Sequence, residues 1–176
     1  MGNRSAPADH FARFGLPRSY RVDRKALDAA YERLSFEYHP DLQATAGEER
    51  KQAAQQASAE LNEGYRILRS DTERAAYLLR LLNDGAKLNT EALPDGFLQA
   101  MFMLQEEIED LDPDNATRRA ELRADIETRV HQIMDNRTGL FDLTEKSPRA
   151  VDADLLQGIQ SNLNEERYLR RLLERL

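Results

Sequence analysis

The chain has 176 residues and no cysteine, with 40% hydrophobic residues, 32% charged residues and a formal net charge of −7. The absence of cysteine excludes disulfides and thiolate metal sites. The acidic balance argues against nucleic-acid binding, because phosphates favour a basic protein face.

Nothing in the sequence indicates a membrane or secretory segment. No apolar run approaches the roughly 20 residues of a membrane-spanning helix. Residues 1–7 lack the apolar core of a signal peptide. We therefore predict a cytoplasmic protein that binds no membrane.

The sequence predicts an all-α fold in two parts. No segment alternates between apolar and polar residues as a strand would. Helical periodicity instead predicts helices near residues 9–14, 23–38, 46–69, 71–83, 95–111, 114–137 and 150–175. Turn residues at Asn83-Asp84-Gly85 and Pro94-Asp95-Gly96 separate the parts, with Asp95 a predicted N-cap. We therefore expect a domain over residues 7–84, a connector over 85–94 and a three-helix bundle over 95–176.

The tripeptide His39-Pro40-Asp41 is the most specific motif, because of its position between two helices. The preceding helix has an apolar stripe that includes Leu27, Tyr31 and Leu34. Pro40 lacks a backbone N–H and cannot continue that helix, and it favours an extended conformation for His39. The pattern predicts a rigid loop that presents an imidazole and a carboxylate at the end of a helical hairpin.

The segments around this loop resemble the J-domain of DnaK co-chaperones. Asp9–Leu16 is similar to the opening turn of that domain, Tyr31–Asp41 to its second helix and signature loop, and Ala59–Leu68 to the end of its third helix. Arg74–Leu79 resembles the fourth helix of HscB, the J-domain co-chaperone dedicated to iron–sulfur cluster assembly. The chain is identified as a member of the HscB family. It resembles the bacterial type, because it lacks the metal-binding cysteine module of some eukaryotic relatives.

The resemblance implies a chaperone-binding surface. In the family, the aspartate that matches Asp41 engages an arginine in the ATPase domain of a DnaK-class chaperone, and His39 and Pro40 hold the loop. Arg33 and Lys25 would supply positive charge to the same surface.

The chain departs from the family pattern at three positions of this surface. Glu32, Glu37 and Leu42 stand where J-domains often have basic residues. We therefore expect either a weaker and less salt-sensitive encounter with the chaperone than a generic J-domain makes, or a chaperone partner with a matching surface.

The helix over residues 97–111 is predicted to be apolar on two sides. Its core stripe follows a 4-3-4-3 spacing: Phe97, Met101, Leu104, Ile108 and Leu111. At 100° per residue, Leu98, Phe102 and Met103 point largely away from this stripe, among Gln99, Glu106, Glu109 and Asp110. An apolar spot rimmed by carboxylates is typical of a docking surface. The alternative, that the bundle or the first domain covers this side as well, stays open from the pattern alone.

The family resemblance favours docking. In HscB proteins the first helix of the second domain binds the iron–sulfur scaffold protein. It uses apolar residues that match Leu98 and Phe102 and acids that match Glu106 and Asp110, and an aromatic that matches Tyr168 contributes from the last helix. Gln99 and Met103 lie on the same surface but differ in type from the usual family residues.

The resemblance therefore implies a co-chaperone that is not itself an enzyme and holds no cofactor. It would stimulate the ATPase of a DnaK- or HscA-type chaperone and deliver an IscU-type scaffold protein to it. The alternative is a general J-domain adaptor that delivers a different client. A metal-dependent or hydrolytic enzyme has little support, because the three histidines, His10, His39 and His131, begin no ligand motif.

Overall fold

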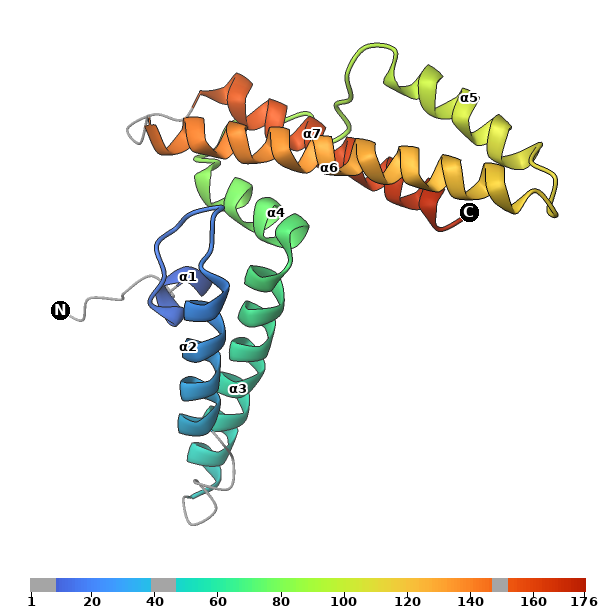
Figure 1. Cartoon of the computed structure of the whole chain (residues 1–176). Helices are drawn as coiled ribbons and strands as arrows, with labels where there is room; N and C mark the ends of the chain where they lie inside the picture. The colour runs from blue at the N-terminus through green and yellow to red at the C-terminus, as the bar shows by residue number, and fades with distance from the viewer. Residues whose placement is uncertain (1–8, 39–46, 147–151) are drawn as a thin grey trace. The chain divides into compact units, whose positions relative to one another are not determined.

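The computed structural model describes residues 9–38, 47–146 and 152–176, and all regular structure in these ranges is helical (Figure 1). The helices are α1 (His10–Phe14), α2 (Arg24–Glu37), α3 (Glu48–Arg69), α4 (Asp71–Leu82), α5 (Phe97–Glu109), α6 (Ala116–Lys146) and α7 (Ala153–Leu173). The chain divides into two compact units, Met1–Leu78 and Leu79–Leu176, with the division inside α4. The all-α prediction is confirmed. No helix in the described ranges is both long and apolar enough to span a membrane.

Aspartates begin the first two helices. The side chain of Asp9 accepts a hydrogen bond from Ala12 N at 2.8 Å, and Asp23 accepts from the backbone N–H groups of Lys25 and Ala26. Each cap satisfies N–H groups that have no partner within the helix. Gly15, in the left-handed conformation with φ of 67°, ends α1.

The first unit is a helical hairpin of α2 and α3 with α1 packed against it. The Tyr31 and Tyr65 rings stack at 4.1 Å between centroids, and their hydroxyls donate to Asn62 and Asp28, each at 2.8 Å. Gly64 permits the approach of α1, because a Cβ there would lie only 2.9 Å from the His10 ring. The apolar core includes Phe11, Phe14, Leu27, Leu34, Leu61 and Leu68.

Arg74 at the start of α4 is a structural residue. It is only 5% exposed, and it donates to Tyr20 O at 2.8 Å and to Leu68 O at 2.6 Å, while it also pairs with Asp71. Its guanidinium lies 5.1 Å from the centroid of the Tyr20 ring. These contacts hold the segment between α1 and α2 against the corner between α3 and α4.

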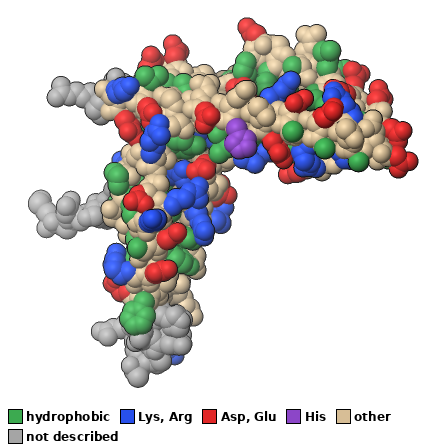
Figure 2. Space-filling model, viewed as in Figure 1, with side chains coloured by type: hydrophobic (Ala, Val, Ile, Leu, Met, Phe, Trp, Pro, Cys, Tyr) green, Lys and Arg blue, Asp and Glu red, His purple; other side chains and the backbone are tan. Residues whose placement is uncertain are grey.

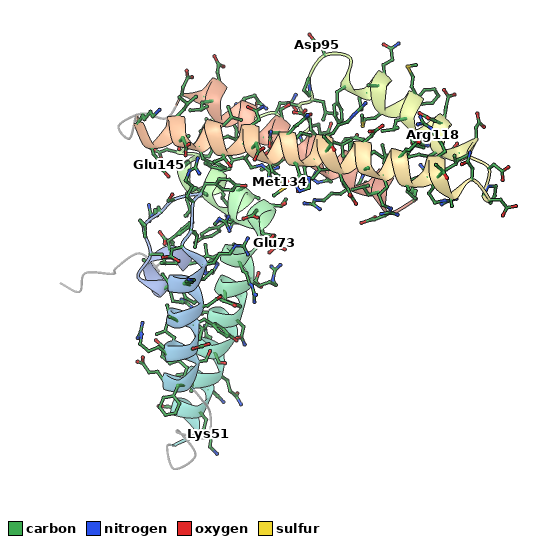
Figure 3. All side chains as sticks on the ribbon, in the orientation of Figure 1. Lys51, Glu73, Asp95, Arg118, Met134 and Glu145 are labelled. Carbon is green, nitrogen blue, oxygen red and sulfur yellow. The ribbon has the colours of Figure 1, made fainter. Side chains whose placement is uncertain are left out.

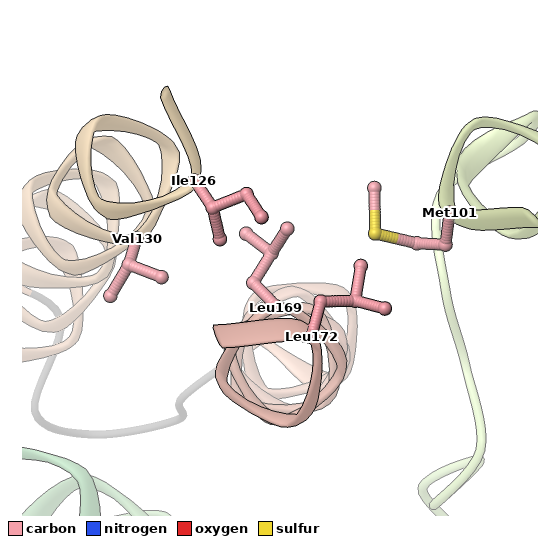
Figure 4. Close-up of a cluster of buried hydrophobic side chains, with 5 residues drawn as sticks. All are labelled: Met101, Ile126, Val130, Leu169 and Leu172. Carbon is pink, nitrogen blue, oxygen red and sulfur yellow. The ribbon is translucent and has the colours of Figure 1, made fainter. Parts of the chain in front are cut away.

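The second unit buries one apolar cluster among α5, α6 and α7. Met101 comes from α5, Ile126 and Val130 from α6, and Leu169 and Leu172 from α7 (Figure 4). α6 and α7 lie side by side over most of their length (Figure 1). α5 packs mainly against α7. The prediction that three amphipathic helices share one core is confirmed.

A buried polar network fixes α6 against α7. Arg137 and Glu166 are each 0% exposed and form an ion pair. Arg137 Nε donates to Asn162 Oδ1 at 2.8 Å, and Asn162 Nδ2 donates to Ile133 O at 2.9 Å. The half-exposed Arg170 donates to the second oxygen of Glu166 at 2.6 Å. Because buried charges need several partners at once, this network favours one register of the two helices.

Several helix boundaries differ from the prediction, and two of the differences have a clear physical reason. α6 continues to Lys146 instead of ending near residue 137, because Phe141 and Thr144 are buried. Their packing outweighs the cost of about 1 kcal/mol that Gly139 imposes on a helix interior. The prediction of Asp95 as an N-cap is wrong, because α5 begins one residue later, after a left-handed Gly96 with φ of 74° and without a side-chain cap.

Candidate functional site

The first candidate surface lies on α2. Lys25 and Arg33 are both exposed, and their eight-residue spacing places them about 12 Å apart along the helix axis. Arg33 pairs with Glu37 at 3.8 Å, which offsets part of its positive charge. The rest of the predicted surface falls outside the described residues: His39, Pro40, Asp41 and Leu42. The role of this surface in chaperone binding stays a prediction.

One exposed aromatic residue near the end of α2 was not among the predicted site residues. Phe36 is 73% exposed, more than any other exposed large hydrophobic side chain of the described residues. It precedes the His39-Pro40-Asp41 tripeptide by three positions. At 100° per residue it lies 180° from the buried Leu27, so the helical wheel that identified the core stripe also contained this signal.

The second candidate surface is the outer side of α5. Leu98, Phe102 and Met103 are 56%, 61% and 63% exposed. On the opposite side of the helix, Met101 is buried and Phe97 packs against the same cluster. The predicted two-sided character of α5 is confirmed, whereas the binding role of the outer side stays a prediction.

Two acids near the C-terminal end of α5 form ion pairs within the second unit. Glu107 pairs with Arg118 of α6, which Figure 3 labels, and Glu109 pairs with Arg175 at 2.7 Å. The pKa of the Glu109 carboxyl lies below its usual range because Gln105 and then Arg175 donate hydrogen bonds to it.

Glu106 and Asp110 have no ion pair or hydrogen bond from their carboxylates within the described ranges. Gln99 is exposed on the same side of the helix. Acidic side chains gather at the end of the bundle where α5 passes into α6 (Figure 2). Glu106 and Asp110 are therefore the α5 acids that are available to a partner.

Tyr168 joins α7 to this surface. It is 37% exposed, and its ring meets Phe97 edge-on at 5.9 Å between centroids. Tyr168 and Leu98 line the same hollow. We call Leu98, Phe102, Met103 and Tyr168 the α5–α7 patch.

The described residues offer no metal centre. No group of three or more His, Cys, Asp or Glu side chains in these ranges could hold a metal ion. His131 is exposed, and its Nδ1 lies 2.7 Å from Glu127 O one turn earlier on its own helix. His10 packs against the Tyr77 ring at 4.7 Å between centroids.

Comparison with known proteins identifies relatives of both parts. Residues 9–77 match the family model of the DnaJ domain. A co-chaperone protein HscB homolog of Cupriavidus taiwanensis is 44% identical over 107 residues, which cover 58% of this chain and 61% of that protein. The HscB homolog of Bordetella petrii is 35% identical over 140 residues, which cover 78% of this chain and 81% of that protein.

Two solved structures share the fold. The crystal structure of human co-chaperone protein HscB has a TM-score of 0.78 at 21% identity and covers 99% of this chain and 83% of that one. The chaperone HscB from Vibrio cholerae has a TM-score of 0.70 at 24% identity, covering 94% of this chain and 98% of that one. The chain spans only about three fifths of the length of the HscB homolog of Cupriavidus taiwanensis.

Proposed function

Because the chain belongs to the HscB family of J-domain co-chaperones, we propose that it couples a DnaK-class chaperone to an iron–sulfur scaffold protein. The first unit would stimulate ATP hydrolysis by the chaperone, and the second would bind the scaffold and deliver it. The protein itself would catalyse no reaction and would hold no cluster. We expect it to act in the bacterial cytoplasm.

The chaperone half of the proposal depends on His39-Pro40-Asp41, which follows α2 in the sequence. The α2–α3 hairpin itself is held together by the tyrosine pair Tyr31 and Tyr65. Asp41 would form a charged, directional hydrogen bond with an arginine of the chaperone. Phe36, exposed three residues before this tripeptide in the sequence, would add apolar contact area.

One observation carries the scaffold half of the proposal: α5 exposes large apolar side chains on one side, while on the other it buries Met101 and packs Phe97, Leu104 and Ile108 against the core cluster. The unpaired acids Glu106 and Asp110 flank this apolar area and would meet basic side chains of the partner. Residues 95–176 contain 18 acidic and 11 basic residues, which also favours a partner with a basic or mixed surface.

The proposed function depends on having the chaperone contact and the scaffold contact, both weak, in one chain. A scaffold held by the second unit is at high effective concentration near the chaperone that the first unit engages. ATP hydrolysis would therefore be triggered when the client is present, and cluster transfer would be coupled to it.

Calorimetric titration with the iron–sulfur scaffold protein of the same organism tests the scaffold half. We expect micromolar binding by the wild type and loss of at least tenfold in affinity for Leu98→Ala/Phe102→Ala, because two exposed anchors are truncated. A matched control, Leu143→Ala/Phe36→Ala, removes one leucine and one phenylalanine that are also exposed but lie elsewhere. It should bind as the wild type does, with the helicity of both variants unchanged.

The absence of binding by the wild type would contradict the iron–sulfur assignment. Binding of an unfolded test polypeptide in place of the folded scaffold would then favour a general J-domain adaptor.

A further inference from the structure

We infer that the α5–α7 patch ends in an anion-binding hollow, which receives a carboxylate side chain of the scaffold protein. This inference rests on the proposed function, because it adds contacts to the same interface. The hollow has a volume of about 390 Å³ and lies between the connector, the start of α5 and one face of α7.

Two amide side chains fix the connector onto α7 and so form the wall of the hollow. Asn89 N donates to Gln157 Oε1 at 2.7 Å, and Gln157 Nε2 donates to Asn89 O at 3.0 Å. Asn164, only 3% exposed, donates from Nδ2 to Thr90 O at 3.0 Å and to Ala92 O at 2.9 Å. The position of the connector, and with it the shape of the hollow, is therefore set by this chain alone.

Two arginines without ion-pair partners line the hollow. Arg167 and Arg171 are exposed one turn apart on α7, and neither has an ion pair or hydrogen bond from its side chain in the described ranges. The arginines around them are engaged, since Arg170 pairs with Glu166 and Arg175 pairs with Glu109.

The hollow thus has a net positive charge, although the protein as a whole is acidic. Glu91 also lines it, so two arginines and one glutamate lie along its wall, whereas the whole chain has a net charge of −7. A carboxylate that enters would meet two donors of the planar type that binds carboxylates well.

The hollow is continuous with the apolar part of the patch, because Leu98 and Tyr168 line it too. At the other end of α5, Glu106 and Asp110 lie eight and twelve residues beyond Leu98, about 12 and 18 Å along the helix. The surface therefore runs from positive through apolar to negative.

A partner that covers this surface must present an acid, an apolar area and a base in the matching order. The occupant of the hollow is consequently an Asp or Glu side chain beside the apolar contact area of the scaffold. Such an arrangement fixes the orientation in which the scaffold docks, because the reversed orientation would set like charges against each other at both ends.

Charge reversal tests this inference. In the calorimetric titration with the scaffold protein, Arg167→Glu/Arg171→Glu should weaken binding about tenfold, because two attractive contacts become repulsive. The control Lys51→Glu/Arg123→Glu lowers the net charge by the same four units at exposed positions outside the hollow, and Figure 3 labels Lys51. The control should bind within about twofold of the wild type.

A milder variant, Arg167→Gln/Arg171→Gln, removes the charges while it keeps polar side chains of similar reach. It decides the question if the glutamate variant loses helicity, and its expected loss is about threefold. Wild-type affinity for the arginine variants, or equal weakening by the control, would overturn the inference. If Leu98→Ala/Phe102→Ala still abolishes binding in that case, the proposed function stands without it, whereas a wild type that does not bind the scaffold overturns both.

Discussion

Replacement of Arg137 by Met tests whether the buried network between α6 and α7 stabilises the bundle that presents the patch. Arg137 and Glu166 are fully buried, so the variant leaves a carboxylate without its main partner and Asn162 without a donor. Breaking a buried ion pair in this way costs about 3–5 kcal/mol. Because Arg170 still donates to Glu166 at 2.6 Å, we expect the lower value, about 3 kcal/mol.

Hydrogen exchange of the backbone amides in α6 and α7 is the suitable assay, since it reports on this unit separately from the hairpin. A loss of about 3 kcal/mol corresponds to a fall of roughly 100-fold in protection. Arg170→Met is the control: its side chain is half exposed, and the expected loss is about 1 kcal/mol or less.

The double variant Arg137→Met/Glu166→Met should recover at least about 2 kcal/mol relative to Arg137→Met, because it also removes the buried carboxylate that had lost its main partner. A loss below about 1 kcal/mol for Arg137→Met, or no recovery in the double variant, would refute the reasoning.

Further predictions concern the chaperone reaction, the packing of the first unit and one glycine of α6. Asp41→Asn should abolish stimulation of the chaperone ATPase and leave scaffold affinity unchanged; stimulation at the wild-type level would contradict the proposed role of the tripeptide. Phe36→Ala should reduce that stimulation several-fold without a change in helicity. Stimulation of the chaperone ATPase by the wild-type protein should depend only weakly on salt concentration. Gly64→Ala should destabilise the first unit by about 1–3 kcal/mol, because its Cβ would lie 2.9 Å from the His10 ring, whereas Gly139→Ala should stabilise α6 by up to about 1 kcal/mol in open space. Thermal unfolding of both glycine variants measures this contrast, and equal effects would show that the packing of α1 on α3 does not require glycine.

The sequence predicts the helices of this protein well where one apolar stripe dominates. The outward positions of Leu98 and Phe102 follow from helical spacing alone, and the structure agrees. The end of α6 was missed because a glycine weakens a local prediction, while the packing of Phe141 that overrides it is a tertiary effect.

Pairing between helices is what sequence reasoning could not supply. Glu106 and Glu107 are adjacent in the chain, but only Glu107 lies where Arg118 of α6 can reach it. Arg137 and Glu166 are of residue types that usually lie on the surface, and only the packing of α6 on α7 buries them together. The hollow beside Tyr168 likewise depends on the connector that Asn164 holds in place.

The proposed function joins chaperone activation to scaffold delivery in one chain, and the chaperone ATPase rate measured with the scaffold protein present is the decisive test. We expect scaffold and wild-type protein together to accelerate hydrolysis by more than the product of their separate effects. Leu98→Ala/Phe102→Ala should remove this extra acceleration while it retains stimulation without scaffold. The same extra acceleration with that variant, or none with the wild type, would contradict the claim.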